Sequence, residues 1–342
     1  MTLIQENPGA PVELEEVPCD YCGSTDADAV LTHADPLSTL PGDFCVVACR
    51  KCGLRRTNPR PTATSISKAY PKDYEPHLGD AEPPPPPTGS LRWLLVNYRG
   101  YPLGKKAPAL LRWLLWPWAA VHLRNRKIVG YIPYIGDGRL LDFGCGGGRY
   151  VAQMLAAGWK AEGIDAMTDA VKAGREAGLT IHEGTLPGAS LPKDHYDTVT
   201  LWHVLEHVPR PMATLKAVRE VLKPGGRLAV VCPMSDSLTA RWFGGAWYGT
   251  DVPRHLTHFS RATLRRHIKA AGFAVEREHA IRRPTFMRRS LAILAADSKK
   301  PFYAALAHSH VLARLLSHAA LWLGQTSEVL FVARRRESGD NA

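Results

Sequence analysis

The chain has 342 residues, of which 45% are hydrophobic and 8% are aromatic. A chain of this length buries a sizeable core and is long enough for about two domains, and the composition excludes an intrinsically disordered protein. The formal net charge of +11 is unevenly spread, because residues 83–136 contain eight basic residues and no acid. Such a surface attracts nucleic acid, anionic lipid or phosphorylated substrates, and charge alone does not choose among them.

The first 16 residues contain acids and no apolar run, so we expect no signal peptide. No apolar stretch reaches the ~18 uninterrupted residues of a membrane span, and the nearest, residues 109–123, contains Arg112 and Pro117. The sequence therefore predicts a cytoplasmic protein, soluble or peripheral, with its seven cysteines in a reducing compartment.

Two Cys-x-x-Cys-Gly sequences, at residues 19–23 and 49–53, are separated by 26 residues. A spacing of two residues between two cysteines lets both sulfurs bind one Zn²⁺ at about 2.3 Å. The alternative to a metal site is a set of buried or disulfide-bonded cysteines. A site made only of thiolates leaves no position for a substrate, so we expect structural zinc in a ribbon domain over residues 1–75. The predicted metal ligands are Cys19, Cys22, Cys49 and Cys52.

Residues 76–130 form the second predicted segment, a linker with five consecutive prolines from Pro83 followed by helices rich in Trp and Arg. The pentapeptide Leu-Arg-Trp-Leu-Leu occurs twice, at residues 91–95 and 111–115. Trp and Arg together are typical of a membrane interface, and residues 301–324 add a second amphipathic helical stretch. We therefore hypothesise docking on the anionic inner face of a membrane. The alternative is a lid that packs on the catalytic domain with its tryptophans inside.

An apolar strand at residues 140–143 leads into a glycine-rich turn and then into a helical pattern from Arg149. Glycines at such a turn let the backbone approach a ligand closely, and the helix N-terminus adds N–H donors. A second strand ends at Asp165, whose carboxylate can accept both hydroxyls of a ribose. The last position of a dinucleotide fingerprint is Arg149 here rather than glycine, so the pattern favours another nucleoside cofactor.

The order Asp142-x-Gly144-x-Gly146-x-Gly148 resembles motif I of the class I S-adenosylmethionine-dependent methyltransferases. Residues 196–208 and 221–233 resemble the fourth-strand motif and the Pro-Gly-Gly turn of that family, over about 100 residues in all. The resemblance implies an α/β fold, a Rossmann-like seven-stranded sheet whose last strand is reversed, over residues 131–342. A helical insertion is expected at residues 284–325. The implied cofactor is S-adenosylmethionine, with contacts from Asp142, Gly144, Cys145, Gly146, Gly148, Asp165, Gly184, Trp202 and His203.

The connection between Pro233 and Phe259 is long enough to be a functional loop. It contains His255, the candidate general base because an imidazole titrates near neutral pH, and His258, a weaker candidate. Both histidines could instead hold the loop against the helix that Ser260 caps. The predicted substrate-binding residues are Arg254, Trp247 and Tyr248. Glu206 and His207 are interpreted as residues that start a helix.

The ribbon followed by Thr57-Asn58-Pro59-Arg60-Pro61 resembles a subset of bacterial methyltransferases that modify sugars and cell-envelope glycans. That resemblance implies methylation, at oxygen or carbon, of a small-molecule, sugar or lipid-linked glycan acceptor. An RNA methyltransferase that uses the ribbon and the basic linker is the first alternative. It is disfavoured because Leu201-Trp202-His203 replaces an Asn-Pro-Pro-Tyr motif and because the ribbon is rich in acids. A nonenzymatic cofactor-binding protein is the second alternative, and the oligomeric state is not predicted.

Overall fold

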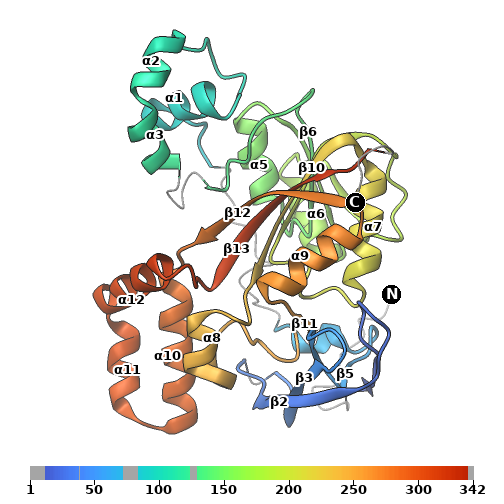
Figure 1. Ribbon diagram of the computed structural model, residues 1–342. Helices are drawn as coiled ribbons and strands as arrows, with labels where there is room; N and C mark the ends of the chain where they lie inside the picture. Colours follow the sequence, from blue (N-terminus) through green and yellow to red (C-terminus); the bar gives the residue numbers. More distant parts are fainter. Residues whose placement is uncertain (1–11, 38, 72–83, 124–128, 338–342) are drawn as a thin grey trace.

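The structure is a computed structural model that describes residues 12–37, 39–71, 84–123 and 129–337 (Figure 1). Residues 72–83, which are the end of the predicted ribbon domain and the first part of the predicted linker, lie outside these ranges, as do the basic residues among 124–128. Most of the first 16 residues, for which no signal peptide was expected, also lie outside the described ranges.

A seven-stranded sheet forms the centre of the molecule, with the strand order β12-β13-β10-β9-β6-β7-β8. The parallel strands are β6 (Arg139–Phe143), β7 (Lys160–Asp165), β8 (Ile181–Glu183), β9 (Tyr196–Trp202) and β10 (Leu222–Pro233). The last strand, β13 (Glu328–Arg335), is antiparallel to both of its neighbours, β10 and β12 (Phe273–Ile281). The structure therefore confirms the predicted α/β fold with a reversed last strand.

Successive residues of β6 face opposite sides of this sheet, as the pleat of a strand requires. Leu140 packs in the core that includes Val151 of α5 (Arg149–Ala156), whereas Leu141 packs in the core that includes Leu215 of α7 and Leu264 of α9. Helices α6 (Thr168–Glu176), α7 (Pro211–Val221) and α9 (Arg261–Ala270) complete the layers around the sheet. The parallel strands thus end together at one edge, where ligands bind in folds of this kind.

The N-terminal part forms a separate four-stranded sheet in the order β11-β4-β3-β2. Its own strands are β2 (Ala27–Ala34), β3 (Asp43–Cys49) and β4 (Arg55–Thr57), while β11 (Thr257–His258) comes from the long connection after β10. Short strands β1 (Leu14–Glu15) and β5 (Arg60–Pro61) pair beside it, and η1 (Ile66–Ala69) follows. The ribbon and the central domain therefore share one sheet.

Two groups of helices project from this body on the same side of the view in Figure 1. The first group is α1 (Gly89–Tyr98), α2 (Ala109–Leu114) and α3 (Trp116–Leu123). The second group is α10 (Pro284–Ser298), α11 (Pro301–His308) and α12 (His310–Trp322), which lie between β12 and β13 within the predicted insertion; α8 (Leu238–Phe243) and η2 (Gly244–Ala246) lie beside them. Within the described ranges, every helix is too short or too polar to cross a lipid bilayer.

Candidate functional site

The turn between β6 and α5 has the backbone of a ligand cradle. Gly144, Gly146 and Gly148 have φ values of +74°, +54° and +86°, a region that favours glycine. A Cβ atom at Gly144 would lie 2.4 Å from the side chain of Val204, so the turn also needs glycine for space. Gly148 is the N-cap of α5 and offers no side-chain cap, which leaves N–H groups at this helix end available to a carboxylate.

Asp165 closes this turn from the end of β7. Its carboxylate accepts the N–H of Gly146 at 2.7 Å and the N–H of Met167 at 2.9 Å. Each carboxylate oxygen has a second lone pair, so Asp165 can still accept ribose hydroxyls. Cys145 lies within the same turn, and Gly184, just after β8, donates its N–H to the Asp165 carbonyl at 2.8 Å. The structure thus brings together residues of the predicted cofactor site that come from three strands.

Asp142 lies beneath the turn and is almost completely buried. Thr200 of β9 donates a hydrogen bond to its Oδ1 at 2.6 Å. Burial raises the pKa of the Asp142 carboxyl to about 7, and the hydrogen bond from Thr200 only partly opposes this.

Trp202 and His203 end β9 next to this cradle. The Trp202 ring meets Tyr150 of α5 edge-on, with the ring centroids 5.2 Å apart. His203 has a φ of +57° and lies between two carboxylates, with Nδ1 3.4 Å from Glu206 and Nε2 3.3 Å from Glu328. Burial alone would lower the pKa of His203, but the charges of Glu328 and Glu206 outweigh it and raise the pKa to about 9.

The predicted base, His255, is buried in the loop that precedes β11. Its Nδ1 lies 2.9 Å from the carbonyl oxygen of Gly249, and because a carbonyl only accepts, Nδ1 is the donor. The lone pair of a neutral His255 ring would then lie on Nε2. His258 is also buried, and its Nε2 lies 3.0 Å from the Thr57 hydroxyl of the ribbon. Burial lowers the pKa of His258 to about 3, so this ring is neutral.

Arg254, predicted to bind substrate, lies in the protein interior instead of at an exposed site. Its guanidinium is fully buried, donates to Asp35 and Asp251 at 2.7 Å each, and also donates to the carbonyl of Ala69 at 2.8 Å. These contacts hold the loop against the ribbon and leave no exposed surface for a substrate anion. Trp247 is likewise buried, whereas Tyr248 is half-buried and its ring meets Phe286 edge-on at 5.1 Å.

Glu206 and His207 are not the start of a helix, because α7 begins at Pro211. They lie in the turn after β9, where Glu206 is almost completely buried and the His207 ring lies 4.6 Å from the His255 ring, measured between centroids. The ribbon residue Tyr70 places its hydroxyl 3.0 Å from His207 Nδ1. An acid and a histidine directly after a parallel strand are a sequence signal for a site at Glu206 and His207, whereas Tyr70 has no such signal.

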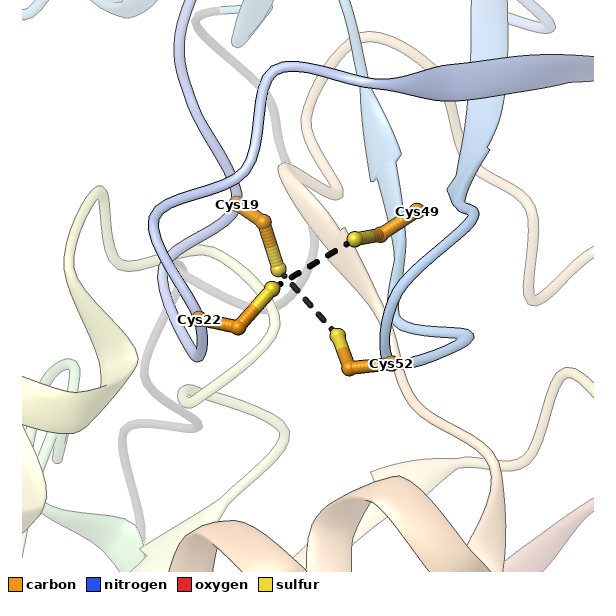
Figure 2. Close-up of side chains that lie close together, drawn as sticks. All are labelled: Cys19, Cys22, Cys49 and Cys52. Carbon is orange, nitrogen blue, oxygen red and sulfur yellow. Dashed lines mark hydrogen bonds between the residues drawn. The ribbon is translucent and has the colours of Figure 1, made fainter.

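The four predicted metal ligands converge, as Figure 2 shows. The Sγ atoms of Cys19 and Cys52 are 3.4 Å apart, and those of Cys22 and Cys49 are 3.5 Å apart. Disulfide sulfurs would be about 2 Å apart, whereas two thiolates on one tetrahedral Zn²⁺ are separated by about 3.8 Å. The cluster thus fits Zn²⁺ far better than it fits two disulfides.

The part of the chain that contains the glycine turn is similar to known proteins. Residues 119–278 match a family model described as "Methyltransferase domain". The centre of this chain is similar to methyltransferase domains. The match includes β6 to β10 and most of β12, and so contains the cradle, Asp165 and His255.

Two relatives are both named ubiquinone biosynthesis O-methyltransferase. The protein of Paraburkholderia xenovorans is 32% identical over 142 residues, which cover 40% of this chain and 55% of that protein. The protein of Haemophilus ducreyi is 34% identical over 123 residues, covering 32% and 52% of the two chains. The chain spans about half the length of these relatives.

A solved structure of an S-adenosylmethionine-dependent methyltransferase from Mesorhizobium loti is also similar to this chain. It has 18% sequence identity and a TM-score of 0.43, and the alignment covers 65% of this chain and 97% of that one.

Proposed function

We propose that the protein transfers the methyl group of S-adenosylmethionine to a hydroxyl or an acidic carbon of a small-molecule, sugar or lipid-linked glycan acceptor. The observation that carries this proposal is the cradle of Gly144, Gly146 and Gly148 closed by Asp165, within a domain that matches methyltransferases. The bound cofactor would supply a methyl group on a positively charged sulfur, which is already activated for displacement. The chain must then align the acceptor and receive its proton.

In this proposal, Asp165 accepts the ribose hydroxyls, the N-terminus of α5 faces the carboxylate of the cofactor and Trp202 flanks it. His255 is the proposed base, because its Nδ1–H is fixed by Gly249 and its Nε2 is left with a lone pair. The relatives that share this domain are named O-methyltransferases, which favours oxygen as the acceptor atom. The resemblance of the ribbon and the segment after it favours sugars and glycans. The four cysteines would hold a structural Zn²⁺ that maintains the ribbon.

We further propose that α2 and α3 dock the enzyme on an anionic membrane that carries its acceptor. Their side chains Leu110, Trp113 and Val121 are 69%, 72% and 70% exposed, although each is apolar. Several large apolar side chains exposed together indicate a binding surface, and the positive charge around them suits anionic lipid headgroups. Helix α12 adds the exposed Trp322 and Leu315.

The test is a transfer assay with S-adenosylmethionine labelled in its methyl group, using zinc-loaded protein. The acceptor panel contains nucleotide-linked sugars, lipid-linked glycans, small phenols and total RNA. We expect label in a sugar, glycan or phenol product. Label in RNA alone would overturn the proposed acceptor class in favour of the RNA alternative, and cofactor binding without transfer to any acceptor would favour a nonenzymatic protein.

A further inference from the structure

Three side chains from two loops meet beside the proposed base. Glu206 and His207 belong to the turn after β9, and His255 belongs to the loop that leads into β11. One carboxylate oxygen and one ring nitrogen from each histidine all lie within 4.8 Å of one another. The cluster is separate from the four cysteines of the ribbon.

Glu206 is 1% exposed, and among the described residues neither of its carboxylate oxygens has a short, well-aligned hydrogen bond. Its charged neighbour is His203, whose Nδ1 lies 3.4 Å away, and the buried Cys232 thiol lies beside it with a pKa that burial and the Glu206 charge raise. A buried carboxylate without hydrogen bonds is costly, because the folded state must replace its lost hydration. The 3.4 Å contact with His203 engages one carboxylate oxygen and leaves lone pairs on Glu206 for a further partner.

The two imidazoles are prepared to bind a cation. His207 Nδ1 lies 3.1 Å from the carbonyl oxygen of Arg254, and His255 Nδ1 lies 2.9 Å from that of Gly249. A carbonyl only accepts, so a hydrogen bond to it needs the proton on Nδ1, and Nε2 of a neutral ring would then be able to bind a cation. Metal-binding histidines are typically oriented by a hydrogen bond of this kind from the other nitrogen. His207 Nδ1 also lies 3.0 Å from the Tyr70 hydroxyl.

We propose that Glu206, His207 and His255 bind one divalent first-row transition-metal cation, such as Zn²⁺, Co²⁺ or Fe²⁺. Two ligands at about 2.1 Å from one tetrahedral ion are about 3.4 Å apart, so the three groups, which lie within 4.8 Å of one another, would move together by up to about 1.4 Å on binding. Two imidazoles and one carboxylate favour these cations over Mg²⁺, which prefers oxygen ligands. Three protein ligands leave open positions, unlike the closed set of four cysteines. Asp251, whose Oδ2 is 3.8 Å from His255 Nε2, adds negative charge nearby.

The role of this site rests on the proposed function, but the binding of the cation does not. An acceptor hydroxyl that enters an open position loses its proton more readily, because the cation stabilises the oxyanion. The proton passes to water, the new bond forms between the acceptor oxygen and the methyl carbon, and the bond from that carbon to sulfur breaks. His255 is then a ligand rather than the free base.

The experiment is a Co²⁺ titration of the full chain after its ribbon has been loaded with Zn²⁺, followed by visible absorption. The variants are Glu206→Gln and His255→Gln, and the control is His182→Gln on β8, whose histidine lies far from the cluster in the fold. Zinc content and S-adenosylmethionine binding are measured on the same samples. These two readouts show whether each variant is folded and whether the cofactor site is intact.

We expect wild type and His182→Gln to bind one further Co²⁺ per chain, with bands from d–d transitions and without the charge-transfer band of a thiolate. Glu206→Gln and His255→Gln should weaken this binding at least tenfold while retaining zinc and the cofactor. Zinc-loaded wild type that binds no Co²⁺, or binding that survives both substitutions, would overturn the proposal. A failure of cofactor binding in wild type would instead contradict the proposed function and leave the cation result unaffected.

Discussion

Thr57 of the ribbon donates its hydroxyl to the carbonyl oxygen of His255 at 2.7 Å, across 198 residues of sequence. The Thr57 N–H also donates to the carbonyl of Leu256 at 3.1 Å, and β4 pairs with β11 directly beside these contacts. The ribbon therefore fixes the backbone on which the proposed base lies. This relationship gives the N-terminal domain a part in the acceptor site.

Thr57→Val should loosen the loop without emptying the cofactor site, because valine keeps the shape but removes the donor. We expect faster amide hydrogen exchange over residues 254–258 and a fall in methyl transfer of about tenfold or more, since small misplacements of a catalytic group are costly. The exposed Thr32→Val is the matched control on β2. Unchanged exchange in Thr57→Val would show that the ribbon does not hold this loop.

Removal of zinc should act at a distance through the same contacts. Cys22→Ser should lose bound Zn²⁺ and increase hydrogen exchange in β3, β4 and β11 together, because the ribbon depends on its metal. The control is Cys45→Ser, because Cys45 lies on β3 outside the cluster, and this variant should keep its zinc. The test is to measure the zinc content and the amide hydrogen exchange of both variants. Zinc retained at wild-type level in Cys22→Ser would refute the four-cysteine site.

Asp142 predicts a pH dependence of stability with a definite sign. Its folded pKa of about 7 lies above the ordinary value of 3.8, so between these pH values the unfolded chain releases the proton first. This group therefore lowers the free energy of unfolding as pH rises through that window. Asp142→Asn removes the effect and should gain stability relative to wild type from pH 4 to 8, by at most about 4 kcal/mol. Urea unfolding at both pH values tests this, and a difference that does not grow with pH would contradict it.

Membrane docking predicts that exposed tryptophans of α2 and α3 bind lipid. Trp113→Ser combined with Trp116→Ser should weaken co-sedimentation with anionic vesicles about tenfold or more at low salt. Trp242→Ser is the matched control, because Trp242 is 53% exposed on α8 and lies outside these helices. Equal sedimentation of the double variant and wild type would point to the alternative, a lid over the catalytic domain.

The sheet could be predicted because its signals are local. Short apolar strands, the glycine turn after Phe143 and the Ser260 cap of α9 each depend on neighbouring residues, and the structure has all three. The surroundings of Arg254 and Glu206 depend on chain segments that meet only in the fold. The positive charge of Arg254 suggested contact with a substrate anion. In the structure Arg254 instead forms a buried ion pair with Asp35, which is 219 residues away in the sequence. The pairing of β4 with β11 has no sequence signal for the same reason.

The central claim is that the glycine cradle and Asp165 bind S-adenosylmethionine. The most direct measurement is calorimetry of S-adenosylmethionine binding to zinc-loaded wild type, to Asp165→Asn and to the control Asp169→Asn, an exposed acid on α6. We predict micromolar binding by wild type and by the control, and a loss of at least tenfold in Asp165→Asn, because the amide cannot accept both ribose hydroxyls. No binding by wild type, or equal binding by all three proteins, would contradict the account.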